Sequence, residues 1–339
     1  MEPLRQGDPI GGHPHRLSFA PKSPHFHVLV TASHWAEPAQ RIIEQAGGQL
    51  HFLPGSLTED ALTARLSETG AQAIVLRGSA PITDRVLKAS PALRIVAKNG
   101  AGVDSVDLEA ARARGIAVAV APGANAGAVA EHAVALMLAL TRQLPQLDRM
   151  VRAGEWAGST WQGRDFRGAT VGIVGYGSIG RATAQLASAL GARVLVRRPQ
   201  GQADDFATES ELHRLLPQLD ILSLHCPLTE RSRGLIGARE LAMLPRGSLL
   251  INTARGPVVD EAALIDALRS GQLGGAGLDT FDTEPLSAGH PLTALPQVLL
   301  TPHVAGVTRD AGLQVATLTA QNIVDHLAHT ALPALHRVA

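Results

Sequence analysis

Residues 170–196 read TVGIVGYGSIGRATAQLASALGARVLV, and this stretch decides the fold. It begins with an apolar, β-branched run and continues through Gly175, Gly177 and Gly180. An amphipathic segment starts near Ser178, and a second strand-like run follows it. Strand, glycine-rich turn, helix and strand in this order predict a βαβ unit with two parallel strands in one sheet.

The same alternation extends over most of the chain. Short apolar runs such as HVLVT and QAIVLRG alternate with amphipathic segments from residue 27 onward, and the alternation starts again at ATVGIVGYG. A long helix is expected over residues 124–156 with an interruption near Pro145, and a final helix over residues 309–330. At 339 residues the chain exceeds what one hydrophobic core usually serves. We therefore predict an α/β protein with two Rossmann or flavodoxin-like domains, each built on a parallel sheet with a cleft between them.

Composition excludes several classes of protein. Thirty basic and thirty acidic side chains give zero formal charge, so we expect no nucleic-acid partner and no membrane surface. Cys226 is the only cysteine, which excludes an intramolecular disulfide and fits a reducing, cytoplasmic setting. The N-terminal residues lack the apolar region of a signal peptide, and the apolar run AVALMLAL is too short to span a bilayer.

Residues 1–25 are rich in Pro, Gly and His and show no apolar period, so we expect a mobile tail. His13, His15, His25 and His27 lie in or next to this segment. Histidines without a structural anchor are more often polar filler than ligands, and no metal site is predicted.

The glycine-rich turn predicts a dinucleotide site. Glycine suits the tight turn, the approach of the backbone to a pyrophosphate, and the contact of helix with strand, while the helix N-terminus offers free N–H groups. The residues expected to bind the cofactor here are Gly175, Gly177, Ser178, Ile179 and Gly180.

Arg197 and Arg198 end the next strand, where an NAD site carries an acidic residue for the ribose. A guanidinium at this position can instead hold the 2′-phosphate of NADP in a forked, charge-assisted pair. We therefore favour NADP(H) over NAD(H). The alternative is that both arginines are solvated side chains at an exposed strand end.

Three ionisable groups follow strands of the second predicted domain. LLINTARGPVVDE presents Arg255, GAGLDTFDTEP presents Glu284, and VLLTPHVAG presents His303. Because ligands collect at the carboxyl ends of parallel strands, we expect these groups to converge. Each also has a simpler explanation: the arginine could pair with Asp260 or Glu261, the glutamate could mark a surface turn, and the histidine could be a buried, satisfied imidazole.

Taken together, these three groups suit hydride transfer to a 2-keto acid. The protonated imidazole of His303 would supply the proton to the carbonyl oxygen, and the Glu284 carboxylate would favour that charged form. Arg255 would bind the substrate carboxylate and polarise the carbonyl. The nicotinamide would carry out the redox step.

INTARGPVVDE, GLDTFDTEP and LLTPHVAG are similar to motifs of the D-isomer-specific 2-hydroxyacid dehydrogenase family, which includes phosphoglycerate dehydrogenase and glyoxylate or hydroxypyruvate reductases. The resemblance covers the chain from about residue 27 onward. It implies Arg255, Glu284 and His303 as the catalytic triad and Asp279 as the partner of the nicotinamide amide. It also implies a cofactor groove lined by Cys226, Pro227, Thr253 and Ala254.

The resemblance further implies the domain organisation. The substrate domain would combine residues 26–122 with 306–339, the final helix would return to it, and residues 123–305 would form the NAD(P)-binding domain. VLRGSA and KNGAGVDSVD resemble loops that receive the substrate carboxylate. The substrate-binding residues expected in these loops are Arg77, Gly78, Ala101 and Gly102, and Lys98 is a further candidate anchor for a charged tail. For Arg77 and Lys98 an ordinary surface position is the alternative. The resemblance also implies a homodimer through the nucleotide-binding domain and the helical arm near residues 125–155.

Three functions follow. The leading one is an NADPH-preferring reductase of a small 2-keto acid such as glyoxylate or hydroxypyruvate. The second is a short phosphoglycerate dehydrogenase without the regulatory domain of longer relatives. The third is a binding protein similar to nicotinamide-sensing corepressors, against which the intact triad argues. Glu284 stands where formate dehydrogenases carry glutamine, which argues against formate as substrate.

Overall fold

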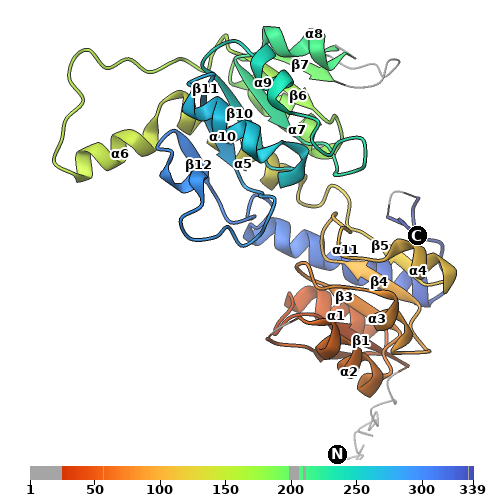
Figure 1. Ribbon diagram of the computed structural model, residues 1–339. Helices are drawn as coiled ribbons and strands as arrows, with labels where there is room; N and C mark the ends of the chain where they lie inside the picture. Colours follow the sequence, from red (N-terminus) through yellow and green to blue (C-terminus); the bar gives the residue numbers. More distant parts are fainter. Residues whose placement is uncertain (1–24, 56, 198–205, 209–210, 335) are drawn as a thin grey trace, which may run out of the picture.

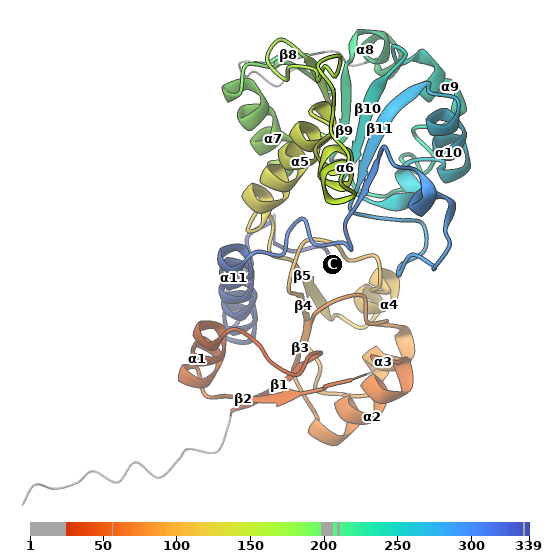
Figure 2. The ribbon, with the colours of Figure 1, turned by 90° about the vertical axis from the view of Figure 1, so that its left-hand side faces the viewer.

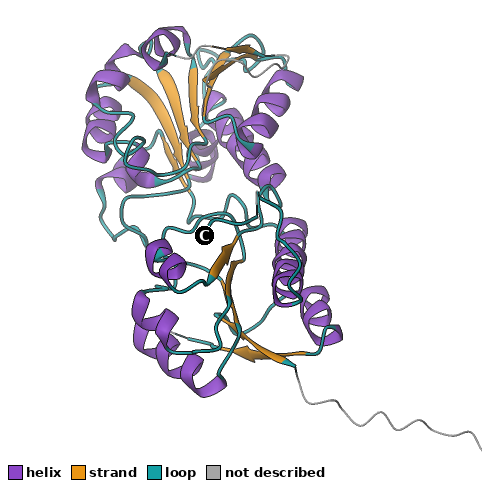
Figure 3. Cartoon of the chain, turned by 90° about the vertical axis from the view of Figure 1, so that its right-hand side faces the viewer, coloured by secondary structure: helices purple, strands orange, loops and turns teal. Residues whose placement is uncertain are grey.

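A computed structural model of the chain describes residues 25–55, 57–197, 206–208, 211–334 and 336–339. It contains two parallel sheets, each covered by helices on both faces (Figures 1 and 3). The predicted fold class, α/β with two parallel sheets of Rossmann or flavodoxin-like type, is confirmed.

The first sheet has the order β2-β1-β3-β4-β5, the arrangement of flavodoxin-like folds. Its strands are β1 (Phe26–Val30), β2 (Gly48–Phe52), β3 (Ala73–Leu76), β4 (Ile95–Lys98) and β5 (Ala117–Ala119). One face is covered by α1 (Glu37–Gln45) and α11 (Arg309–Leu327), and the other by α2 (Glu59–Thr69), α3 (Asp84–Lys88) and α4 (Leu108–Ala113) (Figure 2). The strands read as continuous apolar runs because both faces are buried.

The second sheet has the order β12-β11-β10-β9-β6-β7-β8, and all its pairs are parallel. Its strands are β6 (Thr170–Val174), β7 (Arg193–Arg197), β8 (Ala207–Thr208), β9 (Ile221–Leu224), β10 (Ser248–Asn252), β11 (Leu273–Leu278) and β12 (Val298–Leu300). The helices α5 (Ala126–Thr141) and α7 (Ser178–Ala189) pack on one face. The other face carries α8 (Leu212–Leu215), α9 (Ala238–Met243) and α10 (Glu261–Arg269). Short 3-10 turns lie at Leu216–Gln218, Gly256–Val258 and Pro291–Ala294.

The helix expected over residues 124–156 is interrupted slightly before Pro145. After α5 ends, Gln143 adopts a left-handed conformation with φ of +51°, and α6 (Leu144–Arg152) begins with the proline in its first turn. Proline fits there because the first N–H groups of a helix have no intrahelical partner. The chain therefore changes direction at Gln143, and α6 projects away from the second sheet (Figure 1).

The last helix packs against the first sheet. Ala316, Ala320 and Ile323 of α11 share a core with α1 and with the strands of that sheet. The chain then runs past β5, where Ala119 forms an antiparallel bridge with Arg337. The two ends of the chain thus build one layered unit around the first sheet. Among the described residues, no helix is long and apolar enough to cross a membrane.

Candidate active site

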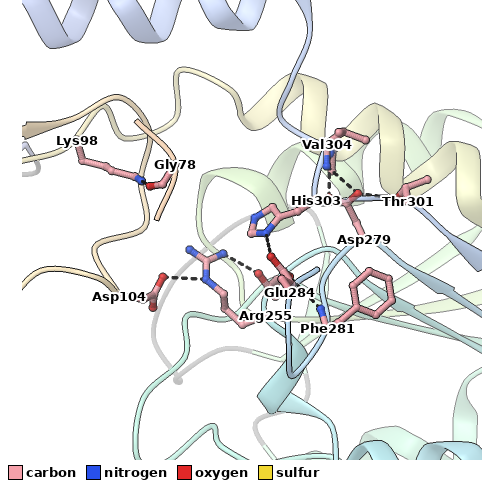
Figure 4. Close-up of polar contacts among 12 residues, drawn as sticks. Gly78, Lys98, Asp104, Arg255, Asp279, Phe281, Glu284, Thr301, His303 and Val304 are labelled. Atoms are coloured by element: carbon pink, nitrogen blue, oxygen red, sulfur yellow. Dashed lines mark hydrogen bonds and ion pairs between the residues drawn. The ribbon is translucent and has the colours of Figure 1, made fainter. Parts of the chain in front are cut away.

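Loops that follow strands of the two sheets face each other across a cleft (Figure 4). Arg255 follows β10, Glu284 follows β11, and His303 follows β12. Because parallel strands end at one edge of their sheet, three sequence-distant loops deliver these side chains to one place. Figure 4 shows all three side chains together, opposite the loops that carry Gly78 and Lys98.

The His303 imidazole forms a hydrogen bond with a carboxylate. Its Nδ1 lies 2.8 Å from Oε2 of Glu284, and Oε1 of the same carboxylate accepts from the backbone N–H of Phe281 at 3.0 Å. The histidine side chain is 48% exposed, so the alternative of a buried, satisfied imidazole is wrong. The pair fixes the ring through Nδ1 and leaves Nε2 facing away from the carboxylate.

Arg255 reaches across the cleft to the first sheet's loops. Its Nε donates to Oδ2 of Asp104 at 3.0 Å, and its Nη1 donates to the carbonyl oxygen of Ala254 at 2.7 Å. A Cβ atom at Gly102 would lie only 2.0 Å from Nη2, so the end of the guanidinium lies directly against this glycine.

The local partners considered for this arginine are wrong. Asp260 instead caps α10, because its Oδ1 accepts from the backbone N–H of Ala263 at 3.0 Å. Glu261 pairs with His290 at 3.1 Å. The acid that Arg255 meets is 151 positions away in the chain.

Asn252 supports the same loop and was not singled out from the sequence. The side chain is 1% exposed; its Nδ2 donates to the carbonyl oxygen of Arg255 at 2.9 Å, and its Oδ1 accepts from the N–H of Ala254 at 3.0 Å. Both contacts fix the backbone at the root of the arginine. The sequence signal that could have identified it is a polar asparagine at the end of a mostly apolar, buried strand, β10.

Asp279 is buried and braces the loop that carries His303. Its Oδ1 accepts from the hydroxyl of Thr301 at 2.5 Å and from the N–H of Val304 at 2.9 Å, while Oδ2 accepts from the N–H of Ala305 at 2.8 Å. His132 of α5 joins this network, with Nε2 3.0 Å from the Thr301 hydroxyl. The predicted contact of Asp279 with a nicotinamide amide stays a prediction.

The substrate loops present exposed backbone and one distinctive lysine. Among the described residues, the N–H groups of Gly78, Ala101 and Gly102 donate no hydrogen bond. The ammonium of Lys98 donates to the carbonyl oxygen of Gly78. Burial, followed by the nearby charge of Arg255, lowers the pKa of Lys98 to about 8.

Arg77 is arranged differently from Lys98. Its Nη1 donates to the carbonyl oxygen of His34 at 2.7 Å, which occupies one end of its guanidinium. Lys98 is therefore the stronger of the two candidate anchors.

The glycine-rich turn fits a dinucleotide. Gly175 has φ of +97°, and a Cβ there would lie 2.4 Å from the backbone nitrogen of Cys226, two residues after the neighbouring strand β9 ends. A Cβ at Gly180 would lie 2.1 Å from the carbonyl oxygen of Gly175. In contrast, within the described part of the chain no atom beyond its chain neighbours lies within 4 Å of a Cβ at Gly177, which caps α7 without a side-chain hydrogen bond. The open backbone and uncapped helix N-terminus suit a pyrophosphate, as predicted for residues 175–180.

Polar atoms without partners lie at other predicted cofactor residues. The buried Oγ1 of Thr253 and Nε of Arg197 have no hydrogen-bond partner among the described residues. Arg197 lies close enough to act electrostatically on Cys226, whose thiol pKa is raised mainly by burial. Donors of this kind match the ribose and phosphate oxygens of a dinucleotide. Arg198, on which the predicted preference for NADP also rests, lies outside the described residues.

No group of three or more His, Cys, Asp or Glu side chains suited to a metal ion occurs in the described part of the chain. The ionisable groups of the candidate active site instead form pairs, such as His303 with Glu284 and Arg255 with Asp104.

Comparisons with known proteins agree with this architecture. Residues 134–305 match the family model described as D-isomer specific 2-hydroxyacid dehydrogenase, NAD binding domain. A glyoxylate reductase of Aeropyrum pernix is 41% identical over 258 residues, which cover 72% of this chain and 77% of that protein. A D-3-phosphoglycerate dehydrogenase of Archaeoglobus fulgidus is 39% identical over 258 residues, covering 75% of this chain and 49% of that protein.

The chain thus spans about half the length of the phosphoglycerate dehydrogenases that it matches. Among solved structures, the TT0316 protein from Thermus thermophilus superposes with a TM-score of 0.84 at 36% identity, covering 92% of this chain and 100% of that one. The match extends through both sheets. The chain belongs to the D-isomer specific 2-hydroxyacid dehydrogenase family.

Proposed function

We propose that the protein reduces a small 2-keto acid, such as glyoxylate or hydroxypyruvate, to the D-2-hydroxy acid, with NADPH as the preferred reductant. The observation that carries this proposal is the His303–Glu284 pair beside Arg255, at the edge of the sheet where the dinucleotide turn lies. Family membership makes hydride transfer the expected chemistry.

The bound nicotinamide supplies or accepts the hydride. Glu284 holds Nδ1 of His303, so Nε2 is the atom that donates a proton to the carbonyl oxygen as negative charge develops there. In the reverse direction the same nitrogen accepts the hydroxyl proton. The second contact of Glu284, to the N–H of Phe281, keeps the carboxylate in place during both steps.

Arg255 binds the substrate carboxylate. Asp104 occupies Nε and Ala254 occupies Nη1, so Nη2, which lies against Gly102, is the amino group left to receive an anion. The free N–H groups of Gly78 and Ala101 add neutral donors from the opposite side of the cleft. A planar carboxylate held from both sides keeps the adjoining carbonyl at a fixed position relative to His303.

Lys98 supports phosphoglycerate dehydrogenase as a second candidate activity. Its ammonium lies in the same cleft and in the field of Arg255, where it could meet a second anionic group on the substrate. A substrate with a phosphate tail would use this lysine, whereas glyoxylate has no tail to reach it.

The preference for NADPH rests on two adjacent arginines. Arg197 contributes a buried Nε without a partner among the described residues, and Arg198 follows it in the sequence. One charge-assisted contact to the 2′-phosphate is worth about 1.5–3 kcal/mol, which corresponds to roughly tenfold to a hundredfold in preference.

The test is kcat/KM for glyoxylate, hydroxypyruvate and 3-phosphohydroxypyruvate with NADPH and NADH, in wild type and Arg198→Asp. We expect a 2-keto acid without a phosphate to be the best substrate and the aspartate to move preference toward NADH. A strong wild-type preference for NADH would overturn the cofactor assignment. A preference for the phosphorylated acid would favour the second candidate.

We further propose a homodimer that forms through α6 and the segment after it. None of the residues of α6 is buried, and Leu144, Val151 and Trp156 are exposed, the last by 83%. A projecting helix with apolar side chains is stable when a second copy covers it. Sedimentation analysis should find a dimer in wild type and a shift toward monomer in Trp156→Glu. A wild-type monomer at micromolar concentration would refute this assignment.

A further inference from the structure

A second candidate binding site lies at the opposite edge of the first sheet from the cleft. A hollow of about 280 Å³ is lined there by Arg94, His326, His329, Thr330, Arg337 and two apolar residues. Arg94 precedes β4, whose other end carries Lys98. The chain turns back toward β5 after α11 (Figure 1), and residues 329–332 of this turn line the hollow.

The two arginines of the hollow lack partners among acidic side chains. Within the described part of the chain, neither Arg94 nor Arg337 forms an ion pair with an Asp or Glu. Nη2 of Arg94 lies 3.3 Å from Nδ1 of His329, and Nε of Arg337 donates to a backbone oxygen of Ala339, the last residue of the printed sequence, at 3.1 Å. Each guanidinium therefore keeps further donors that no described Asp or Glu side chain uses.

Several other arginines of the same unit are paired with acids, although, among the described residues, Arg77 and Arg112 donate only to backbone carbonyl oxygens. Four of them pair with acids at 4.0 Å or less: Arg41 with Glu37, Arg65 with Glu68, Arg85 with Asp60, and Arg114 with Asp84. Asp325, the acid next to the hollow in sequence, accepts from Gln321 one turn earlier on α11 at 2.7 Å. The hollow is distinguished by having in its lining two arginines without an Asp or Glu partner in the part of the chain that the structure describes.

The pKa of His326 reflects burial and the positive charges around its ring. Burial lowers the pKa of this histidine, and the charges of Arg94, Arg337 and His329 lower it further, while a hydrogen bond to the Arg94 backbone acts in the opposite direction. Every charged group that acts on the ring is cationic. The partial negative charge at the end of α11 is about half an elementary charge, which two guanidinium groups outweigh.

We propose that this hollow binds a phosphate-type oxyanion, as inorganic phosphate or as the phosphate group of a small metabolite. Guanidinium forks match the paired oxygens of phosphate, and Thr330 and the two imidazoles add further polar groups. The volume is about nine times the ~30 Å³ of one water molecule, so it accommodates a phosphate with a short organic group.

The site is separate from the catalytic cleft. At 1.5 Å per residue, the 19 residues of α11 place its two ends about 28 Å apart. The first end follows the loop that carries His303, and the second end reaches the hollow. Phosphate binding here does not depend on the proposed function, because loss of keto acid reduction would leave the hollow unchanged.

Calorimetric titration with inorganic phosphate, at constant ionic strength, tests this site. The variants are Arg94→Gln and Arg337→Gln, with Arg112→Gln as the matched control. Arg112 also donates to the C-terminal segment, at the carbonyl oxygen of Val338, but does not line the hollow. Far-UV circular dichroism confirms that each variant is folded at the temperature used. Parallel titrations of Arg255→Gln separate binding in the hollow from binding in the cleft.

We expect wild type, Arg112→Gln and Arg255→Gln to bind phosphate alike, and affinity to fall about tenfold or more in Arg94→Gln and Arg337→Gln. Titration with glycerol 3-phosphate distinguishes the two forms of the ligand. Tighter binding than that of inorganic phosphate assigns the hollow to a phosphorylated metabolite, and equal binding assigns it to the free ion. Absence of binding to wild type, equal affinity in all variants, or an equal loss in Arg112→Gln would overturn the proposal.

Discussion

The two sides of the cleft are built in different ways. On the side of the second sheet, each ionisable group is held by a partner: His303 by Glu284, Glu284 by the N–H of Phe281, and Arg255 by its own loop. On the side of the first sheet, Gly78 and Ala101 present exposed backbone with free N–H groups. Lys98 is the one described side chain there that we assign to substrate binding.

This difference suggests a division of tasks: the side of the second sheet carries out proton transfer, and the loops of the first sheet select the substrate. Proton transfer requires groups held within a few tenths of an ångström, and a network of hydrogen bonds around the buried Asp279 provides that constraint. Recognition of a substrate tail can rest on loops, whose conformation and sequence vary more easily. Variants on the two sides should therefore affect different kinetic constants.

Arg255 contacts residues on both sides of the cleft, so its replacement should lower kcat/KM more than the replacement of Lys98 or Thr301. In Arg255→Gln the substrate loses a charged donor and Asp104 loses its partner, so kcat/KM for the keto acid should fall by about 10²–10³. Arg246→Gln, an exposed arginine of the same domain, is the control and should match wild type. A fall of less than about threefold in Arg255→Gln would remove this residue from the site.

Lys98→Met tests the side of the first sheet alone. For 3-phosphohydroxypyruvate, whose phosphate would use this lysine, loss of one charged contact should raise KM about tenfold and leave kcat nearly unchanged, whereas KM for glyoxylate should not change. Because the pKa of Lys98 is lowered to about 8, its charged form is lost as pH rises through that value. The wild-type KM for 3-phosphohydroxypyruvate should therefore rise above pH 8, and the KM of Lys98→Met should lack this rise.

Lys88→Met, which removes an exposed lysine paired with Asp84, serves as the control for Lys98→Met. It should keep both the wild-type KM and its pH dependence. If Lys98→Met lowers kcat and leaves KM unchanged, the assignment of this lysine to substrate binding is wrong.

Thr301→Val should give the smallest effect, on the side of the second sheet. The change removes one of three donors to Asp279 and the partner of His132, which should lower the free energy of unfolding by about 1 kcal/mol. We expect kcat to fall by less than about tenfold. Urea denaturation and steady-state kinetics, with Thr293→Val as an exposed control, measure both quantities. Unchanged stability would show that the hydroxyl does not support the loop.

The fold was predictable because its signals are local. Alternating apolar runs and amphipathic segments follow from strands buried on both faces, and the spacing of Gly175, Gly177 and Gly180 places a helix start at Ser178, where α7 begins. Pro145 indicated a helix interruption but not its position, since a proline is equally compatible with the first turn of a new helix.

Contacts across the cleft were not predictable in this way. Sequence proximity suggested Asp260 or Glu261 for Arg255, but the partner, Asp104, is brought near only by the packing of two sheets. The bracing of the His303 loop by Asp279 likewise joins residues that follow different strands. Such pairs depend on tertiary geometry, which periodicity does not encode.

The central claim is that His303 donates the proton, and single-turnover reduction of glyoxylate by NADPH tests it most directly. His303→Asn is compared with His290→Asn, which alters a second histidine–glutamate pair of the same domain. We predict that His303→Asn binds NADPH as tightly as wild type but reduces glyoxylate at least a hundredfold more slowly, while His290→Asn retains the wild-type rate. An unchanged rate in His303→Asn would contradict the account.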